Sequence, residues 1–231
     1  MNTGPLLALE FSTERASVAL WQEGQILASR EDEGAAPSGR VWSLLDSVLA
    51  EARRTWDDLG GIAYGAGPGG FTGVRLACGI AQGLGLGLGI PLFPVSTLEC
   101  LTEVAPHPRI VVALDARMNQ VYLAAYERQD SGWQECLPPR LCSPGDLSDL
   151  PDLPAGDWWG AGSGAVAWNT LLTLRWASQW QGTIPGLSPH ATHIAALAGQ
   201  ARKRTTGVSP AAAQPIYLRQ RVALTRAERG L

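Results

Sequence analysis

Charge, paired cysteines and basic segments are all scarce in this chain of 231 residues, and each scarcity excludes a class of protein. Charged residues make up 17% of the sequence and the formal net charge is −3. A stand-alone nucleic-acid-binding protein is therefore not expected, because such proteins carry a basic surface. The apolar run near the N-terminus is too short for a signal peptide and follows no basic residues, so we predict a cytoplasmic protein without a targeting segment. The four cysteines form no CxxC pair and are expected to be reduced and mostly buried: Cys78, Cys100, Cys136 and Cys142.

Lysine is also missing where a phosphate-binding loop would need it. Gly65, Gly67 and Gly70 match the GxGxxG pattern of dinucleotide-binding folds. The strand expected next, at 91–96, has no acidic residue, which such sites require. No lysine lies between residues 55 and 106, so a Walker loop is excluded as well. The sequence instead predicts a tight turn at 68–70, with positive φ at its glycines, that leads into a helix capped by Thr72.

The helix predicted from about 72 to 88 is apolar on almost every side. Gly79, Gly83 and Gly87 are four residues apart and form one row. Glycine inside a helix costs about 1 kcal/mol relative to alanine, so the row needs a packing reason. Arg75 and Gln82 interrupt the apolar surface, and a membrane span is not expected. The periodicity leaves two alternatives open: the row packs inside the chain's own core, or it meets a partner.

A strand–turn–strand pattern occurs twice, about 105 residues apart. Residues 7–10 and 112–115 each form a buried strand that ends in a carboxylate, Glu10 or Asp115, and an alternating strand follows each turn. This predicts an α/β protein of two duplicated βββαβα lobes with mixed sheets, divided into residues 1–105 and 106–231. Carboxylate-bearing hairpins that face each other across a cleft are typical of the actin/Hsp70/sugar-kinase class. A chance likeness between two short hairpins is the alternative.

Three further helices are predicted. Residues 40–56 form an amphipathic helix, residues from Ser96 begin a helix with a capping box to Glu99, and residues 188–204 form a helix with Ser188 as its N-cap. Residues 131–157 are predicted to be mostly loop with one strand.

Candidate catalytic groups are few. Glu10 and Asp115 either hold a metal–nucleotide or only cap their turns. His190 and His193 have no carboxylate or cysteine nearby in the sequence, so no zinc site is predicted. Ser163 does not lie in a GxSxG elbow.

Four stretches together resemble the TsaB (YeaZ) family: LLALEFSTERASVALW, the long AYGAGPGGFTGVR segment with the helix after it, ALDARMNQVYLAAY and PIYLR. The resemblance implies the two-lobed actin/Hsp70-like (ASKHA) fold and covers nearly the whole chain. The residues of this chain that match the family motif are Gly67, Pro68, Gly69, Gly70, Phe71, Thr72, Gly73, Arg75, Asp115 and Arg117.

The resemblance also implies a function. TsaB is a non-catalytic subunit that scaffolds and activates the transferase TsaD, with the ATPase TsaE, in forming threonylcarbamoyladenosine beside the anticodon of tRNAs that read codons beginning with A. ATP and metal are expected on the partner subunits, tRNA is expected to be contacted mainly through the complex, and the histidine pair that binds metal in TsaD is absent here. By resemblance, the helices at 40–54 and 72–88 form the interface with TsaD, or that of a homodimer when TsaD is absent, through Val41, Leu44, Leu45, Val48, Val74, Ala77, Gly79, Gly83 and Gly87.

Departures from the family pattern concern the phosphate loop. Glu10 stands where the family usually has Asp, Gly70 replaces a common Ser, and Asn119, which tolerates a left-handed turn, replaces a common Gly. Glu10, Ser12 and Thr13 are therefore interpreted as a vestigial phosphate loop. Two alternatives stay open: an enzyme of the same fold, either an ATP-dependent small-molecule kinase or a metallopeptidase-like hydrolase, and a self-associating structural protein.

Overall fold

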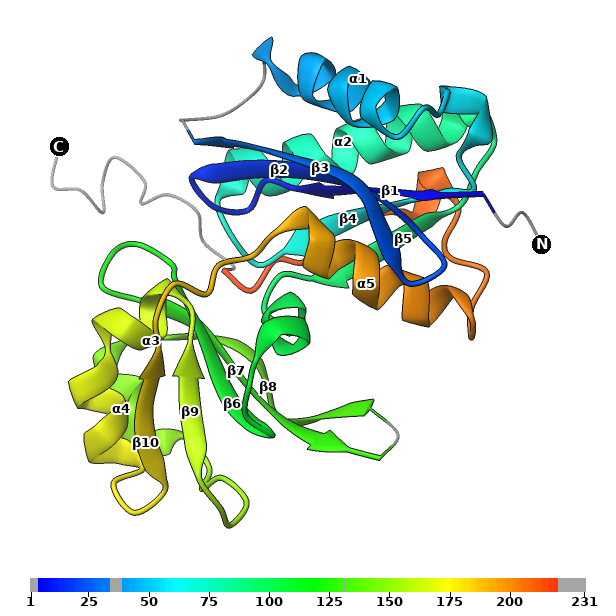
Figure 1. Ribbon diagram of the computed structural model, residues 1–231. Helices are drawn as coiled ribbons and strands as arrows, with labels where there is room; N and C mark the ends of the chain where they lie inside the picture. The colour runs from blue at the N-terminus through cyan, green and yellow to red at the C-terminus, as the bar shows by residue number, and fades with distance from the viewer. Residues whose placement is uncertain (1–3, 34–38, 131, 220–231) are drawn as a thin grey trace, which may run out of the picture.

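Two lobes make up the computed structural model, which describes residues 4–33, 39–130 and 132–219 (Figure 1). Each lobe is built on a five-stranded mixed sheet. The first sheet has the order β3-β2-β1-β4-β5 and consists of β1 (Leu6–Glu10), β2 (Arg15–Gln22), β3 (Gln25–Glu33), β4 (Gly61–Gly67) and β5 (Leu92–Ser96). The second has the order β10-β9-β6-β7-β8 and consists of β6 (Arg109–Asp115), β7 (Val121–Gln129), β8 (Gly132–Cys142), β9 (Trp158–Ala161) and β10 (Trp180–Ile184).

The two sheets repeat one topology, which confirms the predicted duplication. In each sheet the first three strands form an antiparallel meander, and the fourth and fifth strands join in parallel beside the first. Glu10 ends β1 opposite Ser17, and Asp115 ends β6 opposite Val121. The two carboxylates therefore occupy corresponding positions. β8 is the one strand that was predicted within 131–157.

Helices cover both faces of the first sheet (Figure 1). α1 (Val41–Glu51) and α2 (Phe71–Leu88) pack on one face, where their apolar side chains join the buried core around Leu7, Leu9 and Ile62. α5 (Ala191–Arg202) covers the other face. In the second lobe, α3 (Ser163–Ala167), α4 (Asn169–Arg175) and a 3₁₀ helix (Pro144–Asp149) pack on one face of the sheet.

α5 ties the two lobes into one structure. It follows the last strand of the second sheet, and the sequence division at residue 105 assigned it to the second lobe, yet it packs on β1 and β2. The backbone N–H of Ala191 donates to Ser17 Oγ at 2.8 Å, and Arg202 Nη1 donates to the carbonyl of Gly4 at 2.6 Å. One buried apolar cluster includes residues of α5, of both sheets, and of the 3₁₀ helix Glu99–Val104 between the lobes. The core is thus continuous from one lobe to the other.

Three predicted helix ends differ from the structure. α1 stops at Glu51 instead of continuing to residue 56, because the chain turns at Arg53, whose φ is +52°. Ser96 lies in β5 and does not cap an α-helix, since the segment after it is a 3₁₀ helix, although its Oγ accepts the N–H of Glu99 at 3.4 Å. The N-cap of α5 is His190 rather than Ser188, and its Nδ1 accepts the N–H of Thr192 at 3.2 Å.

Candidate functional site

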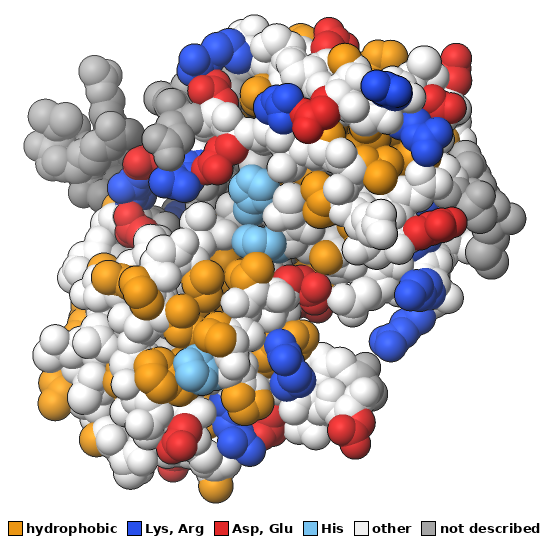
Figure 2. Space-filling view, in the orientation of Figure 1, with side chains coloured by type: hydrophobic (Ala, Val, Ile, Leu, Met, Phe, Trp, Pro, Cys, Tyr) orange, Lys and Arg blue, Asp and Glu red, His pale blue; other side chains and the backbone are white. Residues whose placement is uncertain are grey.

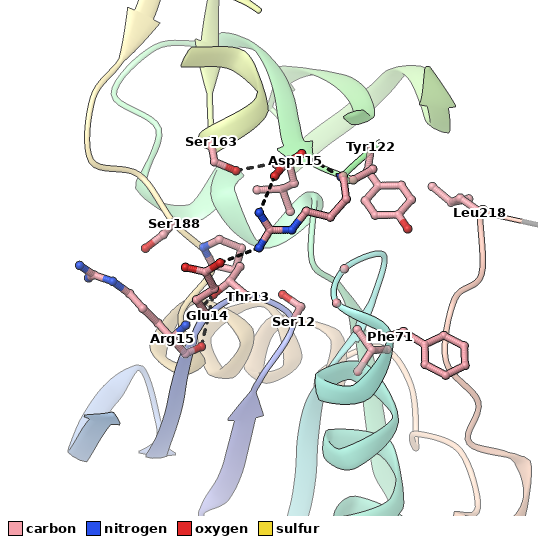
Figure 3. A pocket seen from close by; sticks show the side chains of 18 of the residues that line it. Ser12, Thr13, Glu14, Arg15, Phe71, Asp115, Tyr122, Ser163, Ser188 and Leu218 are labelled. Atoms are coloured by element: carbon pink, nitrogen blue, oxygen red, sulfur yellow. Dashed lines mark hydrogen bonds and ion pairs between the residues drawn. The ribbon is translucent and has the colours of Figure 1, made fainter. Parts of the chain in front are cut away.

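A cleft with a volume of about 880 Å³ lies between the lobes (Figure 3). The turn after β1 and the turn after β6 face each other across it, as the duplication predicted. The N-terminal ends of α2 and α3 also line it, together with residues 216–219 of the C-terminal segment. The cleft therefore occupies the position where ligands bind in two-lobed folds of this kind.

Glu10 does not reach this cleft. Its side chain is fully buried at the end of β1, and its Oε1 accepts the N–H of Ser12 at 2.6 Å. Gly65 on β4 leaves the space for it, because a Cβ at Gly65 would overlap Glu10 Oε2. Burial raises the pKa of Glu10 to about 7, and hydrogen bonding to Ser12 offsets only part of that effect. The first carboxylate thus belongs to the core beneath the hairpin and does not extend toward a ligand.

The glycines of the motif are explained by close packing against the β1–β2 turn. A Cβ at Gly69 would lie 2.5 Å from Ser12 Cβ, and one at Gly73 would overlap the carbonyl oxygen of Phe11. The N–H of Gly70 donates to the carbonyl of Ser12 at 2.7 Å. Sequence reasoning missed this packing, because Phe11 and Ser12 lie more than fifty residues earlier in the chain than the glycines they contact.

The details of the turn before α2 differ from the prediction. Positive φ occurs at Gly67 (+100°), whereas Gly70 is the N-cap of α2 with φ of −57°. The peptide bond between Gly67 and Pro68 is cis. Thr72 lies inside the helix and is exposed, so its side chain makes no capping hydrogen bond. Packing of the turn on the hairpin replaces the side-chain cap.

Asp115 and Arg117 form a bridge between the lobes, to Glu14 on the opposite side of the cleft (Figure 3 labels Asp115 and Glu14). Asp115 Oδ1 accepts the N–H of Arg117 at 2.8 Å, and its Oδ2 lies 3.1 Å from Arg117 Nη1. Arg117 Nη2 reaches across the cleft to Glu14 Oε1 at 2.6 Å. Both carboxylates raise the pKa of Arg117 above its usual value. The turn itself holds three residues with positive φ, and Asn119 is one of them (+54°), as expected.

Thr13, which was predicted with Ser12 to belong to a vestigial phosphate loop, has a hydroxyl that forms hydrogen bonds within its own turn. It is exposed on the cleft wall, and its Oγ1 accepts the N–H of Arg15 at 3.3 Å. The backbone N–H and carbonyl of Ser12 are hydrogen-bonded within the chain, to Glu10 and Gly70, whereas its buried Oγ has no hydrogen-bond partner among the described residues.

Residues 213–219 cross from the first lobe to the second as an extended segment. The N–H of Ile216 donates to the carbonyl of Ala66 at 2.7 Å, and Gln82 Nε2 donates to the carbonyl of Ala213 at 3.0 Å. Arg219 Nη2 donates to the carbonyl of Ala116 at 2.8 Å. This segment, which we call the C-terminal strap, contains the PIYLR motif and forms one wall of the cleft.

The predicted interface residues fall into two groups. Gly79, Gly83 and Gly87 are exposed, and a Cβ at each would meet no described atom within 4 Å. Among the described residues, the row is therefore not packed inside the chain's own core; contact with a partner stays a prediction. Leu44 is half-buried. The other expected residues are buried within this chain, so the glycine row and Leu44 supply the exposed part of the predicted interface: Val41, Leu45, Val48, Val74 and Ala77.

By length and composition, α2 is long and apolar enough to span a membrane, but it also packs on β4 as the core helix of a lobe.

The two histidines at the start of α5 do not form a metal site with other described residues. The rings of His190 and His193 lie 5.7 Å apart, and burial lowers the pKa of His193 to about 4. Within residues 4–33, 39–130 and 132–219, no group of three or more potential metal ligands occurs. On the face shown in Figure 2, acidic and basic side chains are interspersed.

Comparison with known proteins agrees with this architecture. The family model described as "TsaD: tRNA N6-adenosine threonylcarbamoyltransferase" matches residues 36–169. The tRNA threonylcarbamoyladenosine biosynthesis protein TsaB of Escherichia coli K12 is 34% identical over 94% of this chain and 96% of its own length. TsaB of Haemophilus influenzae is 32% identical over 96% of both chains. A crystal structure from Pseudomonas aeruginosa, described as an uncharacterized protein with similarity to peptidase YeaZ, superposes with a TM-score of 0.82 at 35% identity, covering 94% of this chain and all of that one.

The repeated topology and the cleft between two carboxylate-bearing hairpins define a two-lobed protein of the actin-like class. Within that class, the identity and coverage of its relatives are decisive. The chain belongs to the TsaB family, whose members are named for tRNA threonylcarbamoyladenosine biosynthesis.

Proposed function

We propose that this protein is the non-catalytic subunit that scaffolds and activates TsaD in forming threonylcarbamoyladenosine beside the anticodon of tRNAs reading codons that begin with A. It acts in the cytoplasm with TsaD and the ATPase TsaE, and it pairs with itself when TsaD is absent. ATP and metal bind to the partner subunits, and tRNA is contacted mainly through the complex.

The observation that carries this proposal is the exposed glycine row of α2. Glycine inside a helix costs about 1 kcal/mol relative to alanine, and nothing within the described chain uses the space above Gly79, Gly83 and Gly87. Small residues in a row permit close approach of a second helix. Leu86, on the same exposed side of α2, is 77% accessible. A helix of TsaD crossing the row would cover this surface.

The contacts within the cleft support a non-catalytic role. The N–H of Ser12 is taken by Glu10, the N–H of Gly70 by the carbonyl of Ser12, and the N–H of Arg117 by Asp115. Phosphate sites in proteins depend on backbone N–H groups that point at the ligand. Here these groups at the hairpins are already satisfied within the chain.

The test is reconstitution of tRNA modification with TsaD, TsaE, threonylcarbamoyl-AMP and either wild-type or variant protein. Gly83→Arg places a bulky charge on the exposed row without a clash inside the chain, so we expect a folded protein that no longer co-purifies with TsaD and no longer supports modification. Gly145→Arg is the matched control, because Gly145 is an equally open glycine in the second lobe. A folded Gly83→Arg variant that still co-purifies with TsaD would contradict the proposal that the glycine row forms the interface.

A further inference from the structure

Arg75 holds an unusual position at the N-terminal end of the glycine row. It is the one lysine or arginine in the sequence between Arg54 and Arg109. Its Cζ lies 3.1 Å from the centroid of the Phe71 ring and 5.0 Å from that of the Tyr217 ring. Phe71 lies one helical turn before it on α2, whereas Tyr217 comes from the C-terminal strap. Two separate parts of the chain therefore position one guanidinium.

The hydrogen-bonding capacity of this guanidinium is unused within the described chain. Cation–π contacts hold the flat face of an arginine and leave its N–H donors at the edge available. Two other stacked arginines behave differently: Arg128, over Trp133, also donates to the carbonyl of Ala105, and Arg175, over Trp176, donates to that of Leu147. For Arg75, the residues in 4–33, 39–130 and 132–219 supply only the two rings. The residue is exposed.

The surroundings of Arg75 indicate which anion it fits. A nucleic-acid backbone is bound by several basic side chains acting together. Arg75 has no basic neighbour along α2, and Arg219 of the strap already donates to the carbonyl of Ala116. A lone arginine fork matches a single carboxylate, to which it can donate two parallel hydrogen bonds. Arg, Tyr and Trp are also the residue types that most often dominate protein–protein binding energy. Phe71 and Tyr217, the two rings at Arg75, are each about half exposed.

We propose that Arg75, positioned by Phe71 and Tyr217, receives a side-chain carboxylate from the TsaD subunit at one end of the glycine row. The inference rests on the proposed function, which supplies the contact between the two subunits. The TsaD family model matches this chain over 36–169, a range that includes both α1 and α2. A related helix pair on the partner can therefore face this one, and the proposal requires an acidic side chain of that pair opposite Arg75.

Titration of purified TsaD with the full-length chain by calorimetry tests the proposal. Arg75→Met keeps much of the side chain's length and stacking but removes the donors, and we expect the dissociation constant to rise about 10- to 100-fold. Arg75→Lys keeps the positive charge but not the forked guanidinium, and its dissociation constant should lie between those of wild type and Arg75→Met. Tyr217→Leu removes one positioning ring and should weaken binding about 3- to 10-fold, within the range for cation–π contacts. Arg128→Met, which removes a stacked arginine from the second lobe, is the matched control and should bind as wild type does.

Salt and RNA distinguish the possible outcomes. Wild-type affinity should fall as NaCl is raised, and the fall should be shallower for Arg75→Met. Equal affinity and equal salt dependence in wild type and Arg75→Met would overturn the carboxylate contact while leaving the TsaD interface intact. Loss of tRNA binding by Arg75→Met, with affinity for TsaD unchanged, would assign the arginine to a phosphate instead. If wild type itself fails to bind TsaD, the proposed function and this inference both fail. Circular dichroism and thermal melting of each variant establish that it is folded.

Discussion

Glu10 shows how a single side chain can keep its place in the chain while changing its role. It ends the first strand, as Asp115 ends the corresponding strand of the second sheet, but only Asp115 lines the cleft. The extra methylene of glutamate, together with the missing side chain at Gly65, lets the carboxyl group enter the core. The sequence could predict the strand-end position of both acids. It could not predict that one would be buried, because the space for it comes from β4, more than fifty residues away along the chain.

Burial of Glu10 predicts a specific pH dependence of stability. The pKa of Glu10 is about 7 in the folded protein against 4.5 for a glutamate in water, so folding takes up a proton between these two pH values. The free energy of unfolding therefore falls as pH rises through that window and levels off above it. Glu10→Gln keeps an acceptor for the N–H of Ser12 and has no proton to lose. Relative to wild type, this variant should gain about 2–3 kcal/mol between pH 4.5 and 8.

Urea denaturation of both proteins across this pH range measures the difference. Two curves that stay parallel from pH 4.5 to 8 would show that the carboxyl group does not titrate in this window. Asp115→Asn is a suitable comparison, because that carboxylate is exposed at the cleft.

At the scale of a single element, α2 has one face that is closely packed and another that is exposed. Its first turn is pressed on the β1–β2 hairpin, and its glycine row is open to solvent. The sequence predicted the helix to within one residue of its start, at Phe71, and matched its end at Leu88. It could not tell which face was buried, because an apolar surface on nearly every side removes the contrast from which a buried face is read.

Two alanine substitutions in α2 should therefore act in opposite directions. Gly73→Ala places a Cβ on the carbonyl oxygen of Phe11, and we expect it to lower the free energy of unfolding by about 1–3 kcal/mol. Gly79→Ala fills open space and improves helix propensity, so it should raise the free energy by about 0.5–1 kcal/mol. Chemical denaturation at equal protein concentration, low enough that both variants are monomeric, compares them. Equal effects of the two changes would mean that neither face is packed as described.

At the scale of the whole molecule, the cleft predicts weak or absent nucleotide binding. The backbone N–H groups of Ser12, Gly70 and Arg117 are paired within the chain, and the Arg117 guanidinium already joins the two lobes through Glu14. Calorimetry of the isolated chain with ATP and Mg²⁺ should detect no micromolar binding. Micromolar binding that is lost in Asp115→Ala would favour the alternative of a kinase or hydrolase of the same fold.

The lobes should also depend on each other for stability. A fragment of residues 1–105 lacks α5 and would leave one face of the first sheet bare, including apolar residues of β1 and β2 that are fully buried in the whole chain, Leu6, Ala8 and Ala19. We expect this fragment to show no cooperative unfolding transition in urea, whereas the full chain shows one. A fragment that unfolds cooperatively, with the circular dichroism of the intact lobe, would contradict this. The sequence predicted the duplication. It did not predict that α5 packs on the first lobe, because α5 follows the second sheet directly and the strands it covers lie at the other end of the chain.

The position of α5 also has a consequence for synthesis on the ribosome. The N-terminal lobe is made first, yet the helix that closes its sheet ends at Arg202. Until that helix has left the exit tunnel, the lobe waits with an open apolar face, although its five strands and both outer helices have already emerged. Such surfaces are the ones that chaperones bind during translation. The N-terminal lobe is therefore synthesised first but completes its core only after α5 has been made.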